Sequence, residues 1–173
     1  MHAPLRAVQA GGAIPGSVLI EPTPPIPLLV LDTNVVLDWV AFADPRVQCI
    51  VAAIERGALR AATSGACLEE LRRALGYAQL KLDAAVQARA FERYVKYATL
   101  YEIDRSAVAP DLPRCVDADD QKFLELASQV RASHLLTRDK ALLKLARRLA
   151  RPGGFAVLAP DRFFVPAEEL QPG

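Results

Sequence analysis

Residues 28–40 read LLVLDTNVVLDWV, and this stretch decides the fold. Its first four residues are all apolar, which is typical of a central strand in a parallel sheet, because such a strand is buried on both faces. The polar residues Asp32, Thr33 and Asn34 follow at once, and a helix is predicted over residues 35–42. The stretch therefore predicts a buried strand that ends in a carboxylate and leads directly into a helix.

Strand-like and helix-like segments alternate along the rest of the chain. This alternation is typical of right-handed βαβ units, and it predicts a three-layer α/β/α fold with a central parallel sheet. The predicted strands cover residues 28–31, 59–63, 99–103, 134–137 and 155–158. The predicted helices cover residues 35–42, 66–75, 83–97 and 140–150, with one more after Asp44-Pro45 and one after Asp120.

The two ends of the chain differ in composition from this alternating region. Residues 1–26 are rich in Gly, Pro and Ala, which predicts a flexible or polyproline-like tail outside the core. We expect one domain over residues 27–166 and a short C-terminal tail over residues 167–173.

Composition narrows the class of protein. The 173 residues suffice for one domain with a core of its own. A net charge of only +1 excludes a strongly basic nucleic-acid binder, so any such contact must come from a local patch. Three scattered cysteines without a C-x-x-C pair suggest reduced thiols, and two histidines make a zinc site improbable. No apolar run is long enough for a membrane span or a signal peptide, so we expect a cytoplasmic protein.

Four acidic residues stand where predicted strands end or helices begin: Asp32, Glu70, Asp120 and Asp139. In a parallel α/β sheet the carboxyl ends of neighbouring strands converge on one crevice, where ligands bind. Carboxylates gathered there repel one another unless they share a cation, and an all-oxygen site favours Mg²⁺ or Mn²⁺. The pattern predicts metal-dependent phosphodiester chemistry.

Each acid also has an ordinary structural interpretation. Asp32 and Asp139 can cap the helices that follow them, and Glu70 can be a solvated acid near a helix start. Asp117 can cap the next helix with Asp120 in its first turn. The functional interpretation depends on the four acids as a set, because all occupy equivalent places in the predicted fold.

The order of four motifs resembles the PIN-domain nucleases: LDTN at residues 31–34, SGACLEEL at 64–71, DADDQKFLELA at 117–127 and LLTRDKALL at 135–143. The resemblance extends over about residues 28–164. It is strongest to the bacterial toxin components of toxin–antitoxin systems, the VapC-like ribonucleases, and it implies their Rossmann-like fold. It also implies a quartet around one or two Mg²⁺ or Mn²⁺ ions, an additional metal ligand and two supporting polar residues. The implied quartet is Asp32, Glu70, Asp120 and Asp139. The implied additional metal ligand is Asp117, and the implied supporting polar residues are Asn34 and Thr137.

The expected function is a metal-dependent endoribonuclease, the toxin of a type II toxin–antitoxin pair. The resemblance implies RNA as substrate, an antitoxin as partner and a possible homodimer. The alternatives are a PIN nuclease of RNA processing and a binding module without catalysis. An aspartate-nucleophile phosphatase ranks last, because Asn34 stands where that chemistry needs a second aspartate.

Basic residues near the acids are candidates for phosphate contacts. Arg138, Lys140 and Lys144 lie on or beside the helix predicted after Asp139, and Arg72 and Arg73 follow Glu70. The competing interpretation is a solvated helix face. No aromatic platform for stacking bases is evident in the sequence.

Overall fold

The computed structural model describes residues 25–165 and contains one five-stranded sheet with strand order β3-β2-β1-β4-β5. All neighbouring strands are parallel, so the predicted fold class is confirmed. The strands are β1 (Leu28–Leu31), β2 (Arg60–Ser64), β3 (Ala98–Tyr101), β4 (His134–Leu136) and β5 (Ala156–Leu158). The tails predicted at both ends lie almost entirely outside the described residues, and the domain boundaries stay a prediction.

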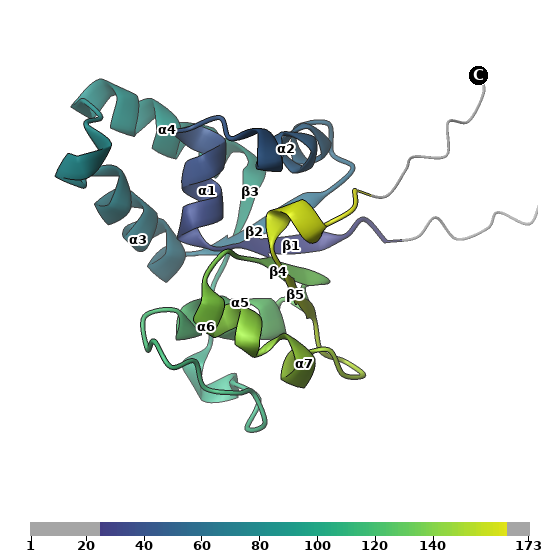
Figure 1. Cartoon of the computed structure of the whole chain (residues 1–173). Coiled ribbons are helices and arrows are strands. Elements are labelled where there is room, and N and C mark those ends of the chain that lie inside the picture. Colours follow the sequence, from purple (N-terminus) through teal and green to yellow (C-terminus); the bar gives the residue numbers. More distant parts are fainter. Residues whose placement is uncertain (1–24, 166–173) are drawn as a thin grey trace, which may run out of the picture.

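Helices cover both faces of the sheet (Figure 1). One side carries α1 (Thr33–Val40), α2 (Gln48–Glu55), α3 (Gly65–Leu75) and α4 (Ala84–Tyr97). The other side carries α5 (Gln121–Gln129), α6 (Lys140–Lys144) and α7 (Ala146–Leu149). Short 3-10 turns complete the described chain: η1 (Pro45–Val47), η2 (Ala78–Leu80), η3 (Arg105–Ala107) and η4 (Pro160–Arg162).

The strand order places a topological switch beside β1. The chain first moves outward from β1 through β2 to β3, then returns to the other side of β1 for β4 and β5. Connections on opposite faces diverge at such a point and leave a crevice at the carboxyl ends of the strands. The residues that follow β1 and β4 therefore face each other, and the backbone N–H of Asp32 donates to the carbonyl of Leu136 at 3.0 Å.

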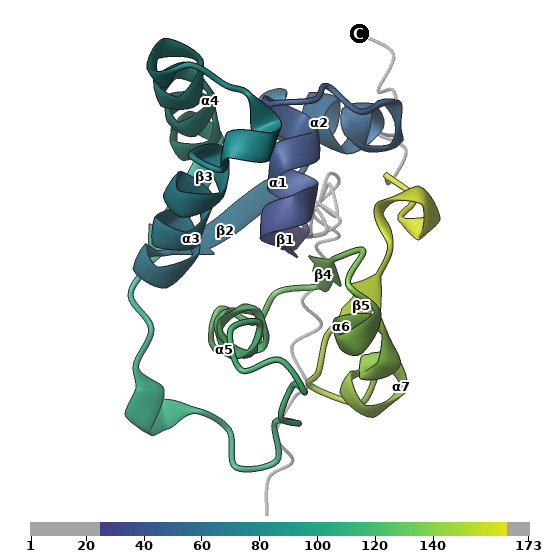
Figure 2. The ribbon, with the colours of Figure 1, turned by 60° about the vertical axis from the view of Figure 1, so that its left-hand side comes forward.

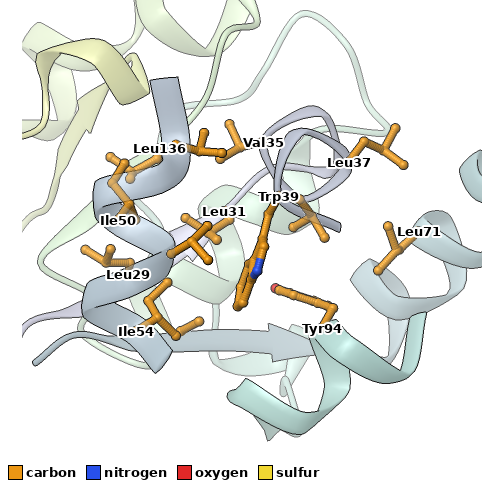
Figure 3. Packing of buried hydrophobic residues seen from close by; sticks show 14 of the residues in the cluster. Leu29, Leu31, Val35, Leu37, Trp39, Ile50, Ile54, Leu71, Tyr94 and Leu136 are labelled. Carbon is orange, nitrogen blue, oxygen red and sulfur yellow. The ribbon is translucent and has the colours of Figure 1, made fainter. Parts of the chain in front are cut away.

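The larger core lies under α1–α4 and is built around Trp39 (Figure 3). The Trp39 ring meets the ring of Tyr94 edge to face at 5.7 Å between centroids, a favoured arrangement of aromatic pairs. Leu29 and Leu31 contribute from β1 to the same cluster, as the uninterrupted apolar strand predicts. This packing fixes α1, and with it the position of Asp32 at its N-terminus.

The predicted elements are largely present, with small shifts at their ends. Asp83 caps α4 through a hydrogen bond from Val86 N–H at 2.8 Å, as expected. Asp44 caps the turn η1 rather than α2 directly. The helix predicted over residues 140–150 is divided at Leu145, because its N–H bonds to Leu142 O, three residues back. Such tight bonds interrupt the regular α-helical pattern.

Within residues 25–165, no helix is both long enough and apolar enough to cross a membrane.

Candidate functional site

An acidic cleft of about 500 Å³ opens at the switch point of the sheet. Figure 2 shows α1 and α3 together on one side, with α5 and α6 beyond β4 on the other. Acids from three separate segments line this cleft: Asp32, Glu70, Asp117, Asp119 and Asp120. The structure thus brings together three of the four predicted quartet members as lining residues, and the fourth, Asp139, acts on Asp120 through its charge.

Asp32 is the most buried of the acids, with 3% of its surface exposed. Its Oδ1 accepts a hydrogen bond from Val35 N–H at 2.8 Å, so it caps α1. Its Oδ2 accepts from the Thr137 hydroxyl. Burial raises the pKa of Asp32, while these donors act in the opposite direction. The capping interpretation is therefore correct for Asp32, but the carboxylate also lines the cleft.

Thr137 connects two of the acids. It is fully buried at the end of β4, and its hydroxyl donates to Asp32 while accepting from Asp139 N–H at 2.9 Å. The hydroxyl thus sets the spacing between the segments that carry Asp32 and Asp139. The supporting role that the resemblance implied for Thr137 stays a prediction.

Asp139 caps α6. Its Oδ1 accepts from the N–H groups of Ala141 and Leu142 at 2.6 and 3.1 Å. Both bonds end on Oδ1, so the other oxygen of the carboxylate takes no part in this cap.

Asp120 has the clearest electrostatic perturbation of the set. Burial, followed by the negative charges of Asp139, Asp117 and Glu70 in that order, raises its pKa to about 6. Asp120 stands at the N-cap position of α5, but within residues 25–165 its side chain accepts no capping hydrogen bond from the α5 backbone. Asp119 is exposed and Asp120 half-buried, which agrees with the choice of Asp120 from helical spacing.

Glu70 lies half-buried on α3 and forms an ion pair with Lys122 of α5. The Lys122 ammonium also donates to the carbonyl of Asp119, and its charge lowers the pKa of Asp120. Sequence reasoning missed Lys122, although its place two residues after Asp120 puts it beside the cleft. Lys122 partly neutralises the acids that surround it.

Two further predicted residues lie at the surface of the cleft. Asn34 is exposed at the start of α1 and lines the cleft. Asp117 is also exposed, and its Oδ1 accepts from Asp119 N–H at 2.9 Å. The loop before α5 brings Asp117 to the same cleft as the buried Asp32.

The predicted phosphate-binding residues are divided by the structure. Arg73 lines the cleft, whereas the Arg72 guanidinium lies over the Phe91 ring at 4.4 Å, between α3 and α4. Arg138 pairs with the buried carboxylate of Asp38. Lys140 and Lys144 are exposed on α6. Of the five, Arg73 alone is among the residues that line the cleft in the described chain.

The acidic side chains of the cleft are chemically suitable ligands for a hard divalent cation. Carboxylate oxygens are the ligands that Mg²⁺ and Mn²⁺ prefer, and burial together with the negative charges of Asp139, Asp117 and Glu70 raises the pKa of Asp120. In the conformation of residues 25–165, no three Asp, Glu, His or Cys side chains are close enough to hold one ion together. Ligation would thus need side-chain rotation, for example of Glu70 away from Lys122.

Comparisons with known proteins agree with this fold. A chain in the crystal structure of VapBC2 from Rickettsia felis bound to a DNA fragment from their promoter has a TM-score of 0.55 at 13% identity, over 75% of this chain and 96% of that chain. At this identity the likeness concerns the fold alone. A search of curated proteins finds no significant match. The family model described as PIN domain matches residues 28–141, from β1 into α6. The chain therefore belongs to the PIN-domain family.

Proposed function

We propose that this protein is a divalent-metal-dependent endoribonuclease. The observation that carries the proposal is that Asp32, Glu70, Asp117 and Asp120 line one cleft. Carboxylates from distant parts of the chain meet at the switch point of the sheet, where α/β proteins bind ligands, and their repulsion favours a bound cation. Membership of the PIN-domain family supports the same reaction.

In this proposal the acids are metal ligands. Asp32, Glu70, Asp120 and Asp139 would hold Mg²⁺ or Mn²⁺, with Asp117 as an additional ligand. Such an ion supplies a water of lowered pKa as nucleophile and offsets charge on the scissile phosphate.

The remaining residues position these groups and the RNA. Thr137 holds Asp32 in place, Asn34 offers an amide to the cleft, and Arg73 contacts a phosphate of the strand. Lys140 and Lys144 extend the phosphate contacts along α6. Arg138 is engaged with Asp38, so we assign it to the scaffold rather than to RNA binding. Hydrolysis of this kind leaves a 5′-phosphate and a 3′-hydroxyl.

We further propose that the nuclease is the toxin of a type II pair and acts in the cytoplasm. The fold likeness to a chain of the VapBC2 structure supports this role. A cognate antitoxin would be its protein partner, and a homodimer is the proposed assembly. A PIN nuclease of RNA processing is the alternative, and it predicts no growth arrest on overproduction.

Cleavage of end-labelled single-stranded RNA tests the nuclease proposal. We expect cleavage with Mg²⁺ or Mn²⁺ and none with EDTA. Asp32→Asn should reduce the rate by a factor of roughly a thousand or more, since the group touches the reacting centre. Its circular dichroism spectrum should match that of the wild type, because an amide oxygen still accepts from Val35 N–H.

Growth measurements with the same pair of proteins test the toxin role. Wild-type protein should arrest growth when overproduced, and Asp32→Asn should not.

In the cleavage test, wild-type-like activity of Asp32→Asn would refute the assignment of the acidic residues as the active site. A metal-independent or absent activity of the wild type would favour a binding module instead.

A further inference from the structure

Two aromatic rings stand half-exposed in the acidic cleft. Phe42 and Tyr77 have 51% and 52% of their surfaces exposed, and both line the cleft that contains Asp32, Glu70 and Asp120. Large apolar side chains left bare in a polar cleft often mark a binding site. Neither ring belongs to the acidic centre described above.

Both rings come after the C-terminal ends of α1 and α3, the two helices that begin with or carry acids of the cleft. Phe42 follows α1, ten residues after Asp32, and Tyr77 follows α3, seven residues after Glu70. At 1.5 Å per helical residue, each ring is displaced from its acid by roughly 10–15 Å along its helix. Both helices start at the carboxyl edge of the sheet and pack against each other, so the two displacements have the same direction.

The backbone at both rings is held by hydrogen bonds. Phe42 N–H donates to Leu37 O at 3.1 Å, and Tyr77 N–H donates to Ala74 O at 3.1 Å. Tyr77 O in turn accepts from Leu80 N–H at 2.9 Å. The rings therefore project from ordered turns, which limits the entropy that a ligand must remove on binding.

Two polar side chains also line the cleft. Arg73 and Gln79 line it together with the two rings. A guanidinium suits a phosphate, and an amide can donate to and accept from the edge of a base. Two rings, a guanidinium and an amide in the same cleft as the carboxylates match the parts of a single-stranded nucleotide chain.

We propose that Phe42 and Tyr77 form a stacking subsite for an unpaired nucleobase of the RNA substrate. The inference rests on the proposed nuclease function and extends it. The stacked base is not the one at the cleaved phosphate but lies further along the strand, because the rings are displaced from the acids. Aromatic stacking accepts any base, and it requires a base face that a duplex hides. The subsite thus selects single-stranded RNA without selecting its sequence.

The test is equilibrium binding of fluorescent single-stranded RNA in Mg²⁺, with all variants made in full-length Asp32→Asn protein so that the strand stays intact. We expect Phe42→Ala and Tyr77→Ala each to weaken binding about tenfold, in line with the loss of one stacking partner. Phe42→Tyr and Tyr77→Phe keep a ring and should bind like the parent. Phe164→Ala is the matched control, because Phe164 is an aromatic residue with 87% exposure that is not among the cleft residues.

Two further probes separate base stacking from simple apolar contact. The first probe is a series of RNAs in which a single abasic site is placed at successive positions along the strand. The parent protein should bind more weakly when the abasic site is at one particular position. The alanine variants should bind that RNA as well as they bind the intact RNA. Phe42→Leu keeps an apolar side chain without an aromatic ring, and we expect it to bind as weakly as Phe42→Ala. Full affinity of Phe42→Leu, or an abasic effect that persists in the alanine variants, would overturn the proposal and favour an apolar protein segment as occupant.

Failure of the stacking subsite can be told apart from failure of the nuclease proposal. If Asp32→Asn still cleaves RNA, the assignment of the acids fails, whatever the rings do. If Asp32→Asn is inactive and the alanine variants bind like their parent, the nuclease proposal stands and the stacking subsite alone fails.

Discussion

At the residue scale, the acids of the cleft serve both the fold and the site. Asp32 and Asp139 cap α1 and α6, whereas Asp120 forms no such bond with α5 in the described chain. A carboxylate that caps a helix is stabilised by the backbone donors. Asp120 lacks that compensation, and burial together with the neighbouring negative charges raises its pKa to about 6.

This difference predicts how stability depends on pH at Asp120. A folded-state pKa of about 6, above the ordinary value of 3.8, means that the folded protein binds the proton more tightly than the unfolded chain does. The contribution of Asp120 to stability is therefore favourable at low pH and is lost as the pH rises from about 4 to 6. Without metal, Asp120→Asn should stabilise the protein above pH 6, by about 1 kcal/mol after allowance for solvent screening.

Urea unfolding in EDTA at pH 4 and pH 7.5 measures this difference. The gain should be present at pH 7.5 and much smaller at pH 4. Asp119→Asn is the matched control, because Asp119 is exposed beside it and should show a smaller dependence. Equal gains for Asp120→Asn at both pH values would contradict the electrostatic account.

At the scale of elements, an ion pair joins α1 to the segment between β4 and α6. Asp38 is buried on α1, and its carboxylate pairs with the guanidinium of Arg138. Burial raises the pKa of Asp38, and the charge of Arg138 opposes that shift. Arg138 stands between Thr137 and Asp139, so the pair holds the segment that carries two of the site residues.

The pair predicts an asymmetric response to mutation. Arg138→Leu should leave the Asp38 carboxylate buried without its partner and lower the free energy of unfolding by about 2–3 kcal/mol, less than for a fully buried pair because Arg138 is partly exposed. Asp38→Asn in the same chain should recover part of that loss. Urea unfolding of the two single variants and the double variant gives the coupling. Additive losses would show that the two side chains do not interact.

At the scale of the whole molecule, metal binding should be visible as a gain in stability. An ion that binds only the folded state stabilises it by mass action, by about 2.7 kcal/mol at a concentration of 100 Kd. For a chain of this size, such a gain corresponds to a rise in Tm of roughly 5–10 °C. We expect Mn²⁺ to raise the Tm of the wild type and to have a smaller effect on Asp120→Asn.

Differential scanning calorimetry at several Mn²⁺ concentrations checks this. Ca²⁺ and Na⁺ at equal ionic strength control for general screening. An equal rise in the Tm of wild type and Asp120→Asn would place the metal elsewhere on the molecule.

Much of the fold could be predicted because local patterns agree with the tertiary structure. The apolar run of residues 28–31 is typical of a strand that is buried on both faces. Capping residues such as Asp83 mark the start of a helix, because their side chains accept hydrogen bonds from its first turn. The helix predicted over residues 140–150 was wrong in one respect, its continuity. Its division at Leu145 depends on packing that helical periodicity does not report.

The sequence by itself determined the strands and most helix starts, because these follow from periodicity and capping over short distances. Only the tertiary structure decided which polar groups meet. The pairing of Glu70 with Lys122, the pairing of Arg138 with Asp38, and the two rings in the acidic cleft all join elements distant in sequence. Contacts of this kind depend on how helices pack on the sheet, and no local pattern encodes them.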